Sequence, residues 1–153
     1  AIHKNPVLAD RFYGFCRAMM EAGIPVTQNH ILVDRDENGH YALSASQLSH
    51  IPTAFICSRD SSAYQLLKIL KEKNIRVPED VSITGFDDYI LSSLCTPKIT
   101  TYSIDVAKLT DSCIWLLLDR IAQPDRPLRH IVISGKIMER DSVRTLSTNL
   151  EPR

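Results

Sequence analysis

The sequence predicts an α/β domain in which a parallel sheet is flanked by helices on both faces. Helix-like and strand-like segments alternate as α-β-α-β-α-β between residues 5 and 88, and such alternation is typical of parallel strands joined by right-handed crossovers. The strand-like segments run into charged residues, as strands of open α/β sheets do where they hold ligands. A chain of 153 residues with 44% hydrophobic residues can build one core.

The first half of the alternation covers residues 5–48. Asn5 and Pro6 suit the start of a helix that ends at Gly23. Apolar residues recur between them at helical spacing and predict a buried stripe. "HILV", residues 30–33, predicts a strand, and Tyr41 to Leu48 predicts a short helix.

The second half holds the clearest elements. "TAFICS", residues 53–58, predicts a strand, and Ser61 to Lys73 predicts a helix that ends at Asn74. "DVSITGF", residues 80–86, predicts the next strand, and "YILSSLC", residues 89–95, a short apolar helix or loop.

The pattern changes after Asp88. Residues 96–105 predict an extended crossover, Val106 to Ala122 a long helix, and His130 to Arg140 a final strand before a polar tail. The long helix is apolar nearly all round, so we expect it to be buried on several sides.

Composition narrows the function classes. The chain has 18 Lys and Arg residues and 18 Asp and Glu residues, so its net charge is zero. A domain that binds nucleic acid by itself normally carries an excess of basic residues. The composition therefore argues against direct DNA binding by this segment. The four cysteines lack C-x-x-C spacing and lie in apolar surroundings, which indicates reduced core thiols in a cytoplasmic protein. No apolar run is long enough to span a bilayer.

The predicted strands end in charged residues that should meet at one edge of the sheet, because parallel strands share the edge where they end. We call this set the charged rim: Asp34, Arg35, Asp36, Ser58, Arg59, Asp60, Asp87 and Asp88, with Asn5 and Arg11 from the start of the first helix. The rim holds no Ser-His pair and no Gly-rich phosphate loop, so no catalytic residue is predicted.

Several rim residues have a structural alternative. Asp60 suits a helix N-cap or first-turn acid, and Asp88 suits a cap of the segment that follows it. Asp87 leaves a buried strand through Gly85-Phe86, which favours a ligand role. Arg11 flanks the buried stripe and needs a partner, either a structural carboxylate or a ligand.

A magnesium site at Asp87 and Asp88 is the sharper alternative, because magnesium prefers oxygen ligands. Adjacent side chains on an extended strand point in opposite directions, which argues against it. The five histidines lack zinc-site spacing. We therefore predict no metal and no cofactor.

Several spaced motifs resemble the effector-binding domain of bacterial LacI/GalR-type transcription regulators. The closest match is "VPEDVSITGFDD" at residues 77–88, against a family pattern V-P-x-D-V-S-x-x-G-F/Y-D. Further matches are "RFYGF" at 11–15, "AGIPV" at 22–26, "TPKITTYSID" at 96–105, "LLLDRI" at 116–121 and "ERDSV" at 139–143. The resemblance covers about residues 5 to 144.

The resemblance implies a periplasmic-binding-protein-like fold whose cleft takes a small molecule, a sugar or related compound. The family's cleft arginine falls on Arg11, its ligand-binding aspartate on Asp87, and a polar residue that is often Asn on Arg59. An arginine there indicates an acidic or phosphorylated ligand, or an internal pair with Asp36 or Asp87. Asn5 and Asp36 complete the expected ligand-binding set. The segment from Asp34 to Glu37 lacks the aromatic residue that often stacks on the ligand.

The resemblance also implies a homodimer, with Tyr64, Leu91 and Leu94 as interface residues or, alternatively, as core. Residues 1–104 would form the second lobe, 105–123 a crossover helix that packs on a first lobe, and 124–153 a return strand and tail. The first lobe and the helix-turn-helix domain that contacts operator DNA would be absent from this chain. No membrane partner is implied.

The expected function is therefore effector sensing in a non-enzymatic transcription repressor. Two alternatives remain. One is a solute-binding module without a DNA role. The other is a magnesium-dependent hydrolase or phosphotransferase that uses Asp87 and Asp88.

Overall fold

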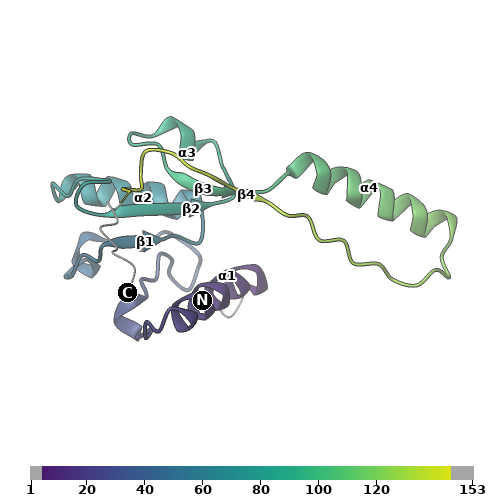
Figure 1. The fold of residues 1–153 in the computed structure, drawn as a ribbon, viewed down its shortest axis with the longest axis horizontal. Coiled ribbons are helices and arrows are strands. Elements are labelled where there is room, and N and C mark those ends of the chain that lie inside the picture. The colour runs from purple at the N-terminus through teal and green to yellow at the C-terminus, as the bar shows by residue number, and fades with distance from the viewer. Residues whose placement is uncertain (1–4, 146–153) are drawn as a thin grey trace, which may run out of the picture.

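The structure is a computed structural model that describes residues 5–145. One long helix, near the N-terminus, lies beside a sheet-and-helix body, and a second long helix projects away from one end of that body (Figure 1). In chain order the elements are α1 (Pro6–Glu21), η2 (Gln28–His30), η3 (Ala45–Gln47), β1 (Ala54–Ile56), α2 (Asp60–Glu72), β2 (Ser82–Phe86), α3 (Leu91–Leu94), β3 (Thr100–Ser103), α4 (Val106–Ala122) and β4 (Lys136–Met138).

The four strands form one sheet in the order β1-β2-β3-β4. β1, β2 and β3 run parallel, with Phe55 beside Ile83 and Gly85 beside Thr101. β4 returns antiparallel to β3. The predicted α/β class is therefore confirmed, and β1 is an edge strand whose Ile56 lies exposed.

The core lies where α2 packs on β2 and α3. Ala63, Leu66 and Leu70 recur at helical spacing and form a cluster with Ile83 and Ile99. α2 ends where the sequence predicts, because Asn74 adopts the left-handed φ of 57° that stops a helix.

Three predicted elements differ from the structure. Residues 30–33 form no strand, and the nearest pairing is the isolated bridge between Arg35 and Tyr41, which follows them around a local turn. The predicted helix from Tyr41 to Leu48 is one 3-10 turn, Ala45–Gln47, in which the Gln47 side chain binds the Ser44 amide.

The final strand is shorter than the predicted segment from His130 to Arg140. Only Lys136, Ile137 and Met138 find partners on β3, so only these residues pair. The polar tail beyond residue 145 lies outside the described part of the chain.

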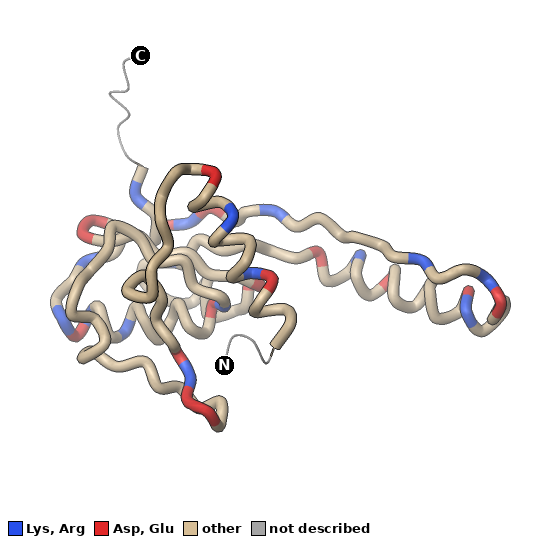
Figure 2. The backbone as a smooth tube through the Cα atoms, turned by 90° about the horizontal axis from the view of Figure 1, so that it is seen from below, with Lys and Arg blue, Asp and Glu red and all other residues tan. Residues whose placement is uncertain are grey.

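The two long helices contribute little to the core. The stripe Leu8, Phe12, Phe15 and Met19 of α1 faces the body, but each side chain is only half-buried, so the expected full burial is wrong. No residue of α4 is buried either, contrary to the sequence-based expectation. Figures 1 and 2 show α4 projecting from the sheet, with residues 123–135 running back beside it. We call residues 105–135 the α4 arm.

The four cysteines are free thiols, and Cys113 on α4 is exposed rather than in the core. Among the helices within residues 5–145, none has both the length and the apolar character that a bilayer crossing requires.

Candidate functional site

The Arg11 guanidinium joins three segments that lie far apart in the sequence. Its Nη2 donates to Asp87 Oδ1 over 2.7 Å, and its Nη1 donates to the Ser58 carbonyl oxygen over 2.6 Å. Its carbon Cζ lies 3.8 Å from the centre of the Phe86 ring, in cation–π geometry. The ends of β1 and β2 therefore meet α1 at one edge of the sheet. For Arg11, Ser58 and Asp87 this is the position that the predicted charged rim gives them.

Asp87 remains open to solvent on one side. Its side chain is 38% exposed, whereas that of Arg11 is 17% exposed. A carboxylate offers about four acceptor positions, and the Arg11 contacts occupy only part of them. Asp87 can therefore accept further hydrogen bonds from a bound hydroxyl or amine.

The backbone after β2 turns sharply to present these groups. Asp87 and Asp88 have φ values of 99° and 53°, in the left-handed region that non-glycine residues rarely adopt. The Asp87 amide donates to the Tyr102 carbonyl of β3 over 3.0 Å. The turn sends the two adjacent carboxylates to different partners.

Asp88 binds Arg140 rather than capping the helix that follows. Arg140 Nη2 donates to Asp88 Oδ1 over 2.5 Å, and its Nη1 donates to Ser92 Oγ and to the Ile99 carbonyl. The hydrogen bond from Arg140 holds the pKa of Asp88 below its usual value. The cap interpretation of Asp88 is therefore wrong, because the N-cap position of α3 belongs to Ile90.

Asp60 is a first-turn acid of α2, but it forms no cap hydrogen bond with that helix. Its carboxylate accepts instead from the Tyr89 amide and from Thr101 Oγ1, each over 2.6 Å. Burial raises the pKa of Asp60, against the opposite effect of these two donors. The N-cap interpretation is therefore wrong, and Arg59 occupies the N-cap position without a side-chain bond.

Arg59 is half-buried beside Ser58, whose carbonyl binds Arg11. Within residues 5–145 its guanidinium forms no hydrogen bond or ion pair, so the internal pair with Asp36 or Asp87 is not formed. Asp87 binds Arg11 instead. Arg59 is thus a positive charge close to the site that can accept an anionic partner.

Asn5 and Asp36 have local structural roles. Asn5 Oδ1 accepts from the Leu8 amide over 3.3 Å and caps α1. Asp36 Oδ1 accepts from the Asn38 and His40 amides in a surface turn. Asp34 is tied to α2, where it accepts from Ser62 Oγ. Among the described residues, Asp36 has no polar contact with Arg11, Arg59 or Asp87.

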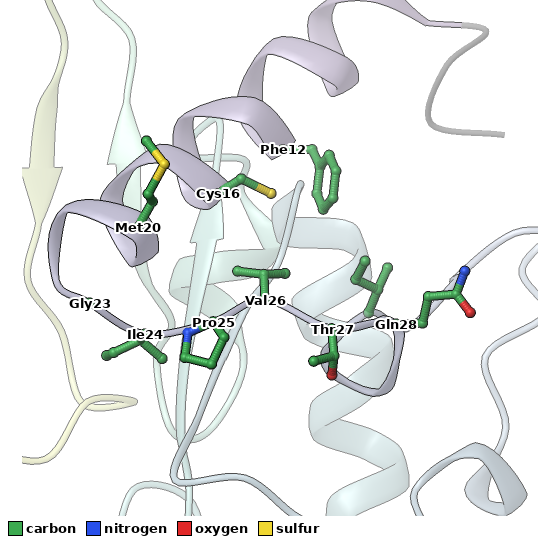
Figure 3. A pocket seen from close by; sticks show the side chains of 10 residues that line it. Phe12, Cys16, Met20, Gly23, Ile24, Pro25, Val26, Thr27 and Gln28 are labelled. Atoms are coloured by element: carbon green, nitrogen blue, oxygen red, sulfur yellow. The ribbon is translucent and has the colours of Figure 1, made fainter.

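An apolar groove of about 680 Å³ lies apart from the Arg11–Asp87 pair (Figure 3). It runs between α1 and the segment from Gly23 to Gln28, and Phe12, Cys16 and Met20 line one wall. It has no charged lining residue, and its polar side chains are those of Thr27 and Gln28.

The residues expected at a dimer interface differ in exposure. Leu94 is 71% exposed, beside exposed Tyr89 and Ile90. Leu91 is half-buried, and Tyr64 is partly buried against the core. α3, which carries Leu91 and Leu94, packs on α2, which carries Tyr64.

Sequence reasoning missed Arg140 and the Ser58 carbonyl. Arg140 lies in the "ERDSV" motif, but a motif match does not show which carboxylate an arginine binds. A main-chain carbonyl has no signature in the sequence at all. Both contacts join segments more than 40 residues apart.

Residues 2–143 match the periplasmic binding protein-like domain family. The chain is 33% identical over 141 residues to the HTH-type transcriptional repressor PurR of Vibrio atlanticus, covering 90% of this chain and 42% of that protein. It is 32% identical over 138 residues to the probable HTH-type transcriptional repressor ExuR of Bacillus subtilis, covering 88% and 41%.

A solved structure of a LacI family transcriptional regulator from Enterococcus faecium, with bound ribose, superposes with a TM-score of 0.75 at 29% identity. The match covers 90% of this chain and 52% of that one. The chain spans about two fifths of the length of the curated relatives it matches. The chain therefore belongs to the periplasmic binding protein-like domain family, and its predicted resemblance to LacI-type regulators is confirmed.

Proposed function

We propose that this chain is the effector-binding and dimerisation portion of a LacI-type transcription repressor that responds to a small molecule, a sugar or sugar derivative. The observation that carries the proposal is the Arg11–Asp87 pair, which is held at the sheet edge with the Asp87 carboxylate partly open to solvent. The role is binding, without a chemical step.

Arg11 and Asp87 have complementary parts in this proposal. The Arg11 guanidinium is held by Ser58 and by the Phe86 ring, so it keeps Asp87 in one orientation before ligand arrives. Asp87 then accepts from ligand hydroxyl groups, and charged acceptors form stronger hydrogen bonds than neutral ones. A site arranged before binding loses less conformational entropy when the ligand binds.

The charge around the pair supports an anionic sugar derivative as the ligand. Arg11 and Arg59 bring two positive charges, and Asp87 neutralises one of them. Arg59 would bind a carboxylate or phosphate group of the ligand, because a guanidinium matches such anions with two donors.

The proposed regulator is a homodimer in the cytoplasm that contacts operator DNA through a helix-turn-helix domain outside this chain. Residues 1–104 would form the second lobe, and α4 would cross to a first lobe. A ligand that prefers the closed arrangement of the lobes shifts the population towards it, which couples ligand binding to DNA binding.

A thermal-shift screen of the intact protein against sugars, sugar phosphates and nucleobases tests the proposal. A compound at a hundredfold excess over its Kd should stabilise the protein by about 2.7 kcal/mol. Asp87→Ala and Arg11→Ala should abolish the shift. Arg17→Ala is the matched control, because Arg17 lies on the same helix but is exposed and, within residues 5–145, pairs only with Glu21. A full shift in the Asp87→Ala variant would contradict the assigned site.

Sedimentation of a second variant pair tests dimerisation. Leu94→Asp should weaken the dimer, because it places a charge in the proposed interface. Leu128→Asp is the control, since Leu128 is exposed on the α4 arm, away from α3. Equal dimerisation of the Leu94→Asp variant and the wild type would show that the interface lies elsewhere.

A further inference from the structure

The turn that carries Asp87 is strained. Two consecutive non-glycine residues, Asp87 and Asp88, have positive φ values of 99° and 53°. Such backbone persists only when its surroundings hold it, and it is found most often where a protein positions a functional group. The question is which contacts hold this turn.

The buried side chain of Asp60 accepts hydrogen bonds at the end of the turn. Asp60 is 1% exposed, and its Oδ2 accepts from the Tyr89 amide over 2.6 Å. Its Oδ1 accepts from Thr101 Oγ1 on β3 over 2.6 Å. Asp60 therefore fixes the residue that follows the strained pair to α2 and to β3 at the same time.

β2 leaves space for the Asp60 carboxylate at Gly85. A Cβ atom at Gly85 would lie 2.0 Å from Asp60 Oδ1, which is closer than any real contact. Glycine is therefore required at position 85 so that Asp60 can cross over β2 to reach Thr101 and Tyr89. Gly85 and Asp60 therefore act together to hold the turn, although neither belongs to the proposed ligand contacts.

We propose that Asp60 is a positioning residue for ligand recognition. It holds the turn from Asp87 to Tyr89 in its strained form, and that form directs the Asp87 carboxylate towards Arg11. This role rests on the proposed function in so far as Asp87 binds the ligand. Asp60 itself touches neither Arg11 nor the open side of Asp87.

Hydrogen exchange of single amides tests this role without any ligand. In Asp60→Ala we expect exchange at Asp87 and Tyr89 to rise about tenfold or more, because the turn loses its buried acceptor. Exchange at Ile83, whose amide donates to the Ser142 carbonyl, should stay unchanged. A purely structural role would instead raise exchange at all three amides together.

Conservative variants make the test specific. Asp60→Asn keeps an acceptor for the Tyr89 amide and should restore slow exchange. Thr101→Val removes the second bond, together with the long hydrogen bond of 3.4 Å that the Asp88 amide donates to Thr101 Oγ1, and leaves the bond from the Tyr89 amide to Asp60 in place. It should give a smaller selective rise, which also serves if Asp60→Ala does not fold. Unchanged exchange at Asp87 and Tyr89 in both Asp60→Ala and Thr101→Val would overturn the proposal.

A second measurement separates this inference from the proposed function. The compound that shifts the wild-type melting temperature in the thermal screen should bind Asp60→Ala at least tenfold more weakly and Asp60→Asn nearly normally. Faster exchange with unchanged binding would overturn the positioning role. If no compound binds the wild type, the proposed function fails, and the exchange experiment still decides whether Asp60 holds the turn.

Discussion

Helices α2 and α4 differ in burial in a way that their sequences do not suggest. α2 has 13 residues, and six of them are buried. α4 has 17 residues and is richer in large apolar side chains, but none of them is buried. The helix with more apolar surface contributes less to the core.

The difference arises from what each helix has to pack against. α2 lies against β2 and α3, so its apolar face meets Val81, Ile83 and Ile99. α4 leaves the sheet after β3, and the main chain beside it is the returning segment 123–135 (Figure 2). Apolar composition thus indicates that a helix needs other segments to pack against. Whether such segments are present depends on the fold of the described residues.

The same substitution in both helices gives the largest expected contrast. Leu70→Ala on α2 removes a fully buried side chain and should lower the free energy of unfolding by about 3 kcal/mol. Leu117→Ala on α4 removes a side chain that is 60% exposed and should change it by less than about 0.5 kcal/mol. Urea denaturation measures both. A comparable loss in Leu117→Ala would mean that α4 is covered in solution.

Two arginines extend the comparison to polar contacts. Arg140→Ala leaves Asp88, Ser92 Oγ and the Ile99 carbonyl without their donor, and should cost about 2 kcal/mol of unfolding free energy. Arg129→Ala, on the α4 arm, loses a contact of 3.7 Å to Asp119 and a place over the Trp115 ring, and should cost less than about 1 kcal/mol. Equal losses would remove the distinction between the two regions.

Low pH should lower the free energy of unfolding of the sheet-and-helix body, because Asp88 becomes protonated. Arg140 holds the pKa of Asp88 below its value of 3.8 in the unfolded chain, so its contribution is complete above that pH and is lost as the pH falls through the folded-state value. Asp88→Asn should therefore lose about 1 kcal/mol at neutral pH and lose less than the wild type on acidification. Denaturation at several pH values measures this, and parallel curves for the two proteins would contradict it.

The smallest effect is spectroscopic. Trp115 is the single tryptophan of the chain and is 48% exposed on α4. Its emission maximum should move little when the body unfolds, whereas circular dichroism reports the full transition. A large shift to longer wavelength on unfolding would place Trp115 in an apolar environment in the folded protein.

The sequence predicted the body well because local patterns and packing agree there. The helix from Ser61 and the strand from Asp80 carry periodicity and turn residues that indicate the same elements, and Asn74 ends the helix where expected. The segment from His30 to Val33 looks equally strand-like, but a strand needs a neighbour, and its pairing partners cannot be read from its own residues.

The site was predictable in part for a related reason. Arg11 and Asp87 follow from the rule that parallel strands end at one edge, and the structure brings them together. Asp36 and Asn5 satisfy the same rule in the sequence, but local turn and cap bonds use their carboxylate and amide oxygens. The role of Asp60 could not be predicted, because its partners lie 29 and 41 residues away.

The anchoring of the α4 arm has a mechanical consequence. Both of its ends continue into the adjacent, paired strands β3 and β4, so the arm pivots from a stiff base. A helix of 17 residues is about 25 Å long. A rotation of about 10° at its base would therefore move its tip by roughly 4 Å, so the length of the arm would magnify a small rotation of the strands that hold it.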